Sequence, residues 1–157
     1  MEAARPATSA DVDRIADLAA EAVAEQAPLR GGGVFAAREA RPLPAGPTIA
    51  DALDDPSQLV VAGTIDEVVI GYAAVRVERL RNGERLGVVT DIYVEREARG
   101  VGVGEAMVDL VLDWCRDQGC SGVDGFALPG NRETKNFFET FGFTARGIVV
   151  HRRLVEP

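Results

Sequence analysis

Apolar residues recur at helical spacing in two long segments of the chain. The first segment predicts a helix over about residues 10–27, which starts behind a capping-box sequence at Thr8 and ends before Pro28. The second predicts a helix that begins near Gly102 and ends before Gly119. One face of this second helix is formed by Val103, Met107, Leu110, Val111 and Trp114.

Alternating and β-branched apolar runs predict the strands of the protein. Residues 58–94 hold three of these runs, which are separated by Asp66-Glu67 and by Asn82-Gly83, a strong hairpin signal. We therefore expect an antiparallel three-stranded meander in this region. Further strands are predicted over residues 2–8, 121–128 and 143–154.

Two shorter helices complete the pattern, one capped by Thr48 and the other by Asn131. Residues 28–47 contain three successive glycines and four prolines, so they predict an irregular loop. The resulting order of elements, β-α-α-β-β-β-α-β-α-β, is typical of an α+β fold.

Composition narrows the class of protein. Residues 1–157 are expected to form a single domain with a substantial core. The net charge of −8 argues against a nucleic-acid-binding surface, which needs a basic face, and two cysteines with one histidine are too few for a convincing metal site. No run of about 18 apolar residues exists and the N-terminus lacks the apolar core of a signal peptide. We therefore expect a cytoplasmic protein with no membrane partner.

The stretch RGVGVGEAM, residues 99–107, places glycines at alternate positions between a predicted strand and a predicted helix. Glycines let successive backbone N–H groups face one concavity and let a ligand approach the chain closely. The start of the helix adds unpaired N–H groups and the positive end of its dipole. This combination favours binding of a phosphate, to which Arg99 could add a charge-assisted hydrogen bond.

Two familiar phosphate-binding loops do not match this stretch. A P-loop ends in Gly-Lys-Ser/Thr, whereas Gly104 is followed by Glu105. The dinucleotide fingerprint belongs to the first βα unit of a parallel sheet, whereas the preceding strands are predicted to be antiparallel. A glycine-rich turn that binds no ligand is the alternative that the glycines alone leave open.

Two motifs in the sequence resemble those of the GNAT superfamily of acyl-CoA-dependent N-acyltransferases. Arg99-Gly-Val-Gly102-Val-Gly104 matches the R/Q-x-x-G-x-G/A motif of that family, and NRETKNFFETFGF is similar to its N-x-x-A-x-x-F-Y-E-x-x-G-F signature. The order of elements also fits over nearly the whole chain. The resemblance implies a GNAT-like fold: a mostly antiparallel mixed sheet with splayed central strands, flanked by about four helices.

The resemblance further implies that acetyl-CoA is the cosubstrate. Its pyrophosphate would lie on the backbone N–H groups of the glycine loop, and its pantetheine arm would pair with the fourth strand where the sheet splays. A peptide-like arm can bind to exposed backbone groups in this way. The residues implicated in binding are Ile92, Val94, Arg99, Gly100, Val101, Gly102, Val103, Gly104, Glu105, Asn131 and Phe138.

The expected reaction is direct attack of a neutral primary amine on the thioester. Family members often protonate the leaving thiolate with a tyrosine, and the matching residue here is Phe138. Water or Tyr93 is therefore the expected proton donor. Asp91, on the same predicted strand and face as Tyr93, is the leading candidate base; a solvated or salt-bridged carboxylate is the alternative.

The sequence says less about the acceptor substrate and the oligomeric state than about the cofactor. A small-molecule amine is favoured over a protein amine. The acidic total charge favours a cationic acceptor, while Arg30, Arg38 and Arg41 favour an acidic one. A homodimer is possible by analogy with related proteins. The alternative functions are a non-catalytic acyl-CoA-binding sensor, suggested by Phe138, and a nucleotide-binding module.

Overall fold

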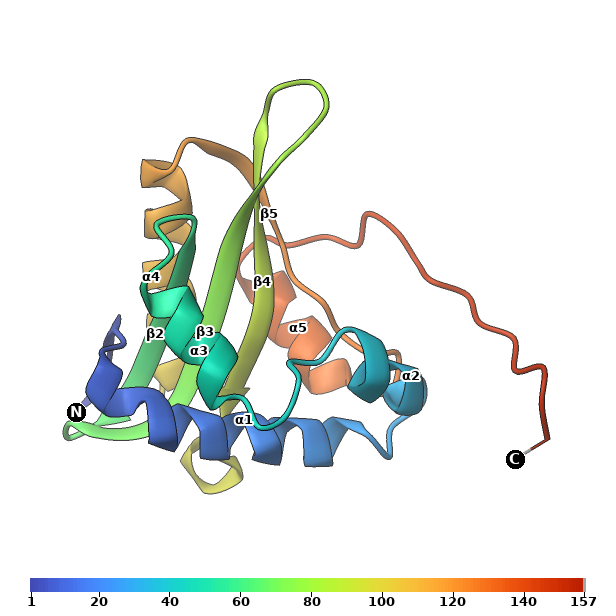
Figure 1. The fold of residues 1–157 in the computed structure, drawn as a ribbon, viewed down its shortest axis with the longest axis horizontal. Coiled ribbons are helices and arrows are strands. Elements are labelled where there is room, and N and C mark those ends of the chain that lie inside the picture. Colours follow the sequence, from blue (N-terminus) through green and yellow to red (C-terminus); the bar gives the residue numbers. More distant parts are fainter. Residues whose placement is uncertain (157) are drawn as a thin grey trace.

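The computed structural model describes residues 1–156 and contains one mixed sheet of five strands in the order β1-β2-β3-β4-β5 (Figure 1). The first four strands pair antiparallel and β5 pairs parallel to β4. This is the mostly antiparallel mixed sheet that the sequence predicts. The strands are β1 (Glu2–Pro6), β2 (Gln58–Ile65), β3 (Val68–Arg79), β4 (Arg85–Val94) and β5 (Cys120–Asp124).

The meander over β2, β3 and β4 is confirmed, together with both of its turns. Asp66 and Glu67 have φ angles of 48° and 71°, the left-handed conformation of a tight hairpin turn. Gly83 has a φ angle of 90°, and its N–H donates to Leu80 O. The two turns set the registers of the three strands on which the candidate site is built.

Helices cover both faces of the sheet and enclose two apolar cores. On one face of the sheet, α1 (Val12–Gln26) and α3 (Gly46–Leu53) pack against the first core. On the opposite face, α4 (Val103–Asp117) packs against the second core (Figure 1). The capping box at Thr8 is present, although a short 3₁₀ turn, η1 (Ser9–Asp11), precedes α1. Gly119, with a φ angle of 76°, follows α4 as predicted.

The splay of the central strands is confirmed. The pairing of β4 with β5 ends where Val88 meets Asp124. Within residues 1–156, the remainder of β4, residues 89–94, has a paired strand only on its β3 side. That part of β4 consequently offers backbone hydrogen-bonding groups beside the start of α4.

The predicted loop over residues 28–47 is partly wrong, because it contains α2 (Gly32–Arg38). A Cβ atom on Gly32 would lie 2.2 Å from Gln26 O, so this glycine permits close packing against the end of α1. Also, α3 starts at Gly46 rather than behind Thr48, whose hydroxyl instead donates to Ala45 O. With α5 (Arg132–Thr140), the described residues form five α-helices where about four were expected.

The predicted last strand, residues 143–154, is also wrong for this single chain. Residues 143–156 form no helix or strand and extend away from the sheet (the red end in Figure 1). The alternating apolar pattern favours a strand, but a strand requires a neighbouring strand, and within residues 1–156 this segment has none. Of the helices in residues 1–156, none combines the length and the apolar character needed to cross a bilayer.

Candidate active site

A cavity of about 160 Å³ opens beside the splayed part of β4 and the start of α4. It brings together residues that are far apart in the sequence, from α1, β4, the glycine loop, α4 and α5. Val101, Gly102 and Phe138 were also predicted to bind the cofactor, but they do not line this cavity. The predicted residues that do line it are Ile92, Tyr93, Val94, Arg99, Gly100, Val103, Gly104, Glu105 and Asn131.

Backbone N–H groups form an open row of donors at this cavity. In the described part of the chain, none of the N–H groups of residues 100–105 donates to a protein acceptor. The first backbone hydrogen bond beyond them runs from Ala106 N–H to Gly102 O, at 3.0 Å. Because the positive end of the α4 dipole adds to these donors, the row is suited to an anion without the help of a cationic side chain.

The three alternating glycines of the loop serve two different purposes. Gly100 and Gly102 have φ angles of 83° and 101°, which a side chain rarely adopts. Gly104 is helical, and a Cβ atom there would lie 3.1 Å from the ring of Phe137. The first two glycines therefore aim the N–H groups, and the third lets α5 pack closely against α4.

Arg99 is held by protein groups in this structure. Its Nη1 and Nη2 atoms donate to the Glu25 carboxylate at 2.9 and 2.6 Å, and its Nε donates to Val94 O at 2.9 Å. The hydrogen bond from Arg99 lowers the pKa of Glu25, which burial opposes. Arg99 thus fastens α1 to the end of β4, a role that differs from the expected contact with phosphate.

Glu25 was missed by the sequence analysis. Glu25 lies at a polar position of the first predicted helix, where a glutamate is an ordinary residue. Its partner, Arg99, is 74 residues away in the chain. Local pattern could not have found the pair, because only the packing of α1 across β4 brings the two side chains together.

Tyr93 lines the first cavity, and Asp91 and Tyr93 share a face of β4 as predicted. The Arg99 guanidinium lies 5.4 Å from the centroid of the Tyr93 ring. Burial, followed by the nearby Glu25 carboxylate, raises the pKa of Tyr93 above its usual value. The phenol therefore keeps its proton at neutral pH and can act as a hydrogen-bond donor.

Asn131 caps α5, as its position in the sequence predicts. Its side-chain oxygen accepts a hydrogen bond from Thr134 N–H at 3.1 Å, and its Nδ2 donates to Gln26 Oε1 at 3.3 Å. The cap fixes the start of α5 at the wall of the cavity.

A second cavity, of about 380 Å³, adjoins the first. The two share Gln26, Ile92 and Thr134 in their walls. Its own lining includes the stacked rings of Phe35 and Phe126, whose centroids are 5.6 Å apart. The splayed part of β4 thus borders two adjacent spaces, one rich in backbone donors and the other lined by side chains.

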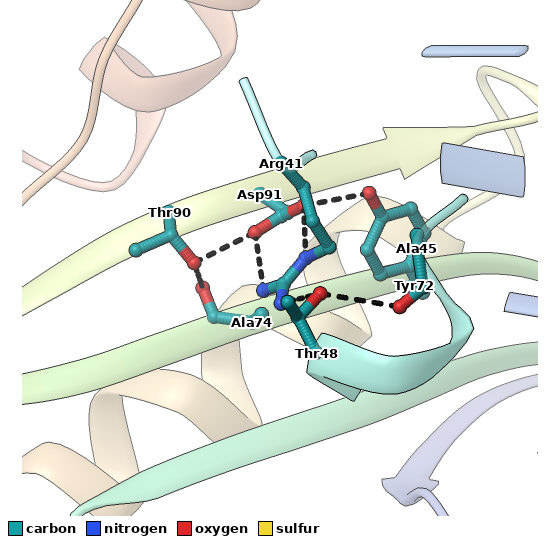
Figure 2. Close-up of polar contacts among 7 residues, drawn as sticks. All are labelled: Arg41, Ala45, Thr48, Tyr72, Ala74, Thr90 and Asp91. Carbon is teal, nitrogen blue, oxygen red and sulfur yellow. Dashed lines mark hydrogen bonds and ion pairs between the residues drawn. The ribbon is translucent and has the colours of Figure 1, made fainter. Parts of the chain in front are cut away.

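Asp91 lies in the wall of the second cavity and is saturated with donors, as Figure 2 shows. Arg41 Nε and Nη2 donate to its two oxygens at 3.0 and 2.8 Å. The hydroxyl groups of Tyr72 and Thr90 donate at 2.8 and 2.7 Å. Both oxygens of this carboxylate are occupied and its ion pair with Arg41 is nearly dry, so the arrangement favours the salt-bridged alternative over a free base.

The charges of this cluster compensate one another. Burial acts to lower the pKa of Arg41, but the hydrogen bond and charge of Asp91 outweigh it and the pKa is raised. Burial first, and then the Asp91 charge, raise the pKa of Tyr72 well above its usual value. Arg41, which the sequence analysis counted toward an acidic acceptor, therefore contributes little net charge to the cavity.

Phe138 lines the second cavity rather than the first, and it is 6% exposed. Its ring packs against Phe143 with centroids 5.0 Å apart, and a Cβ atom on Gly125 would lie 2.6 Å from it. The ring of Phe138 thus reaches from α5 to Gly125, just after β5, and fills the space between them. It has no acidic group that could donate a proton to a leaving thiolate.

Comparison with known proteins identifies the class. The model of the acetyltransferase (GNAT) family matches residues 19–143. Since the match covers well over half of the sequence, the chain belongs to the acetyltransferase (GNAT) family. Glucosamine 6-phosphate N-acetyltransferase of Arabidopsis thaliana is 28% identical over 97 residues, which cover 60% of this chain and 63% of that protein. The chain thus matches less than two thirds of the length of this curated relative.

Solved structures confirm the fold. A mutant of the BH1408 protein of Bacillus halodurans superposes with a TM-score of 0.82 at 17% identity, covering 97% of this chain and 99% of that chain. AAC(6')-Iy, solved with the bisubstrate analogue CoA-S-monomethyl-acetylneamine, superposes with a TM-score of 0.75 at 18% identity, covering 98% and 97%. Family membership and the N-acetyltransferase relative together support an acyltransferase activity.

Proposed function

We propose that this protein transfers an acetyl group from acetyl-CoA to a primary amine of a small molecule, by direct attack of the amine on the thioester. The observation that carries the proposal is the row of free N–H groups over residues 100–105, placed beside the splayed end of β4. A diphosphate has the charge and the acceptor oxygens to match this row.

The donor molecule would occupy the first cavity. With its pyrophosphate on the glycine loop, its pantetheine arm would run along the free side of β4 and exchange hydrogen bonds with the backbone of Ile92 and Val94. Val94 O already accepts from Arg99 Nε, and a carbonyl oxygen has a second lone pair for a ligand. The thioester would then lie near Ile92 and Thr134, where the two cavities meet.

The acceptor would occupy the second cavity. Its ionic residues include the compensated pair of Arg41 and Asp91, so the wall imposes no strong net charge. The stacked rings of Phe35 and Phe126 add a flat apolar surface. These features support a small amine that carries an apolar or planar body more than they support a strongly acidic or strongly cationic acceptor.

The proton transfers follow from what each side chain can hold. The attacking amine loses its proton to water in the second cavity, because the oxygens of Asp91 are occupied. Asp91 acts as a positioning residue that keeps Arg41 and Tyr72 in place. Tyr93 donates a hydrogen bond to the departing thiolate, whose pKa of roughly 8.5 makes it a tolerable leaving group near neutral pH.

Thermal shift followed by an amine screen tests the proposal. Acetyl-CoA should raise Tm in proportion to the logarithm of its concentration, and ATP alone should not. A panel of small amines should then release free CoA thiol with at least one acceptor. Stabilisation by acetyl-CoA with no thiol release from any amine would support the sensor instead. Stabilisation by ATP alone would support the nucleotide-binding module.

The role of Tyr93 has its own test. Tyr93→Phe removes the phenol hydrogen but keeps the ring beside Arg99. We expect kcat to fall by about tenfold, the value of one hydrogen bond to the leaving group, with the Kd of acetyl-CoA changed by less than about twofold. An unchanged kcat with an unchanged pH profile would show that water alone protonates the thiolate.

A further inference from the structure

Arg76, on β3, differs from the other arginine that lines the second cavity. Arg41 and Asp91 compensate each other there and are nearly dry. The side chain of Arg76 is 44% exposed, and its one ion pair in the described chain, with Glu78 at 3.6 Å, is too long for a hydrogen bond. The wall of the cavity therefore carries a guanidinium whose donors are free for a ligand.

Arg76 lies away from the junction of the two cavities. It pairs with Val88 across β3 and β4, whereas Ile92 lines both cavities. At about 3.3 Å per residue, the path along β4 from Ile92 to Val88 is at most about 13 Å long. An acceptor whose amine lies at the junction therefore meets Arg76 with its opposite end.

A flat apolar surface lies in the same cavity. The rings of Phe35 and Phe126 stack with an angle of 11° between their planes, and Phe126 is 44% exposed. Part of this aromatic surface is therefore left for a ligand, and offset stacking of a further ring on it is favourable. These rings fit an acceptor whose two ends are joined by a planar, apolar body.

We propose that Arg76 is a specificity-determining residue that binds a carboxylate at the end of the acceptor opposite to the amine. The inference rests on the proposed function and narrows it. The acceptor class is then a small amine with a planar, apolar body and one carboxylate. The planar fork of a guanidinium matches the two oxygens of a carboxylate, so the contact selects by geometry as well as by charge.

The other charges of the wall favour a single negative charge on the acceptor. Glu39, just after α2, has the guanidinium of Arg38 at 3.4 Å, and Asp91 is paired with Arg41. A phosphate would bring a second negative charge, for which the described wall has no second free cation. An acceptor with one ammonium and one carboxylate has no net charge, which agrees with the compensated wall.

Two acceptors that differ only in a carboxylate test the inference. Benzylamine and 4-(aminomethyl)benzoate share the ring and the amine. The unaltered protein should release CoA thiol with a kcat/KM about tenfold higher for the carboxylate compound, the value of one charge-assisted contact at a half-exposed site. Arg76→Gln should bring the ratio of the two kcat/KM values close to one, and Arg76→Lys should restore part of it. A ratio that Arg76→Gln leaves unchanged would overturn the inference.

Arg79→Gln is the matched control. It removes the same charge from the same strand, but Arg79 does not line the cavity. The preference for the carboxylate compound should therefore survive in Arg79→Gln. If both variants lose the preference equally, it comes from the overall charge of the protein and the assignment to Arg76 is wrong. Arg76→Gln should keep the Tm of the original protein, because the ion pair that it removes is exposed.

Binding without turnover separates this inference from the proposed function. Titration calorimetry in the presence of CoA measures the Kd of 4-(aminomethyl)benzoate, which Arg76→Gln should raise about tenfold. That rise with no thiol release from any amine would support the carboxylate site and reject acetyl transfer. Thiol release with equal kcat/KM and equal Kd for the two acceptors would keep the transfer and overturn the role of Arg76. Tenfold tighter binding of the matching phosphonate would overturn the choice of a carboxylate.

Discussion

The Asp91 cluster lies near the end of β4 and the glycine loop follows that end, and the two are built in opposite ways. The loop presents backbone N–H groups over residues 100–105 that have no protein acceptor in the described chain. The cluster presents a carboxylate that accepts hydrogen bonds from Arg41, Tyr72 and Thr90 and is 7% exposed. The loop therefore has polar groups without hydrogen-bond partners, whereas the polar groups of the cluster are all paired with one another.

The comparison distinguishes a loop that is suited to binding a ligand from a cluster that maintains the shape of the protein. Unpaired donors at a helix start are stabilised when an anion arrives, so the loop gains hydrogen bonds on binding. A saturated ion pair gains none, and it instead keeps α3 and the segment before it fixed against β3 and β4. In the proposed function, donor binding would therefore depend on backbone groups, whereas the shape of the second cavity depends on side chains.

Disrupting the Asp91 cluster should have the largest effect, and that effect should be on stability. Asp91→Asn leaves the guanidinium of Arg41 nearly dry and without a counter-charge. We expect the free energy of unfolding to fall by about 3–5 kcal/mol, which lowers Tm by roughly 10 °C in a chain of this size. Urea and thermal unfolding measure the loss. Acetyl-CoA should still bind with Kd changed by less than about twofold.

Two variants serve as controls for that result. Asp113→Asn removes one partner of an exposed ion pair with Arg116, and its stability should stay within error of the original protein. Arg41→Met combined with Asp91→Asn removes both buried charges and should recover part of the lost stability. If Asp91→Asn is as mild as Asp113→Asn, the cluster does not hold the fold in the way described.

Disrupting the glycine loop should weaken the binding of CoA more than it lowers the stability of the fold. Gly102→Val forces a β-branched residue into a φ angle of 101° and turns the loop N–H groups away. The Kd of CoA should rise at least about tenfold, equivalent to about 1.4 kcal/mol. Gly83→Val is the matched control, because Gly83 has a φ angle of 90° in a distant hairpin with nothing within 4 Å of an added Cβ. Equal CoA affinities of the two variants would remove the loop from the binding site.

Breaking the ion pair that joins α1 to the glycine loop should give the smallest effect. Arg99 lowers the pKa of Glu25, so the pair stabilises the folded state fully above the unfolded pKa of about 4.3. The stabilisation is lost as the pH falls through the lower folded pKa. Glu25→Gln should lower the free energy of unfolding by about 1 kcal/mol at pH 7. Urea titrations from pH 3 to pH 7 should show the difference closing toward low pH, and a constant difference would assign the effect to packing.

Much of the fold could be predicted because its signals are local. The capping box at Thr8, the Asn82-Gly83 turn and the glycine after α4 each act within a few residues. The helix α2 was missed because three glycines normally mark a loop, and here Gly32 is required by contact with the end of α1. The predicted last strand was wrong because a β-type pattern does not by itself supply the neighbouring strand that the segment needs.

The backbone part of the candidate site could be predicted without a structure. Glycines at alternate positions before an amphipathic helix are visible in the sequence, and backbone conformation is a local property. Tertiary structure alone decided which side chains are free to act. Asp91 could be a base or half of an ion pair until Arg41, 50 residues away, was brought against it. Arg99 likewise became a structural partner of Glu25 only when α1 crossed β4. Ionisable side chains take their roles from neighbours in space, and those neighbours are chosen by the fold.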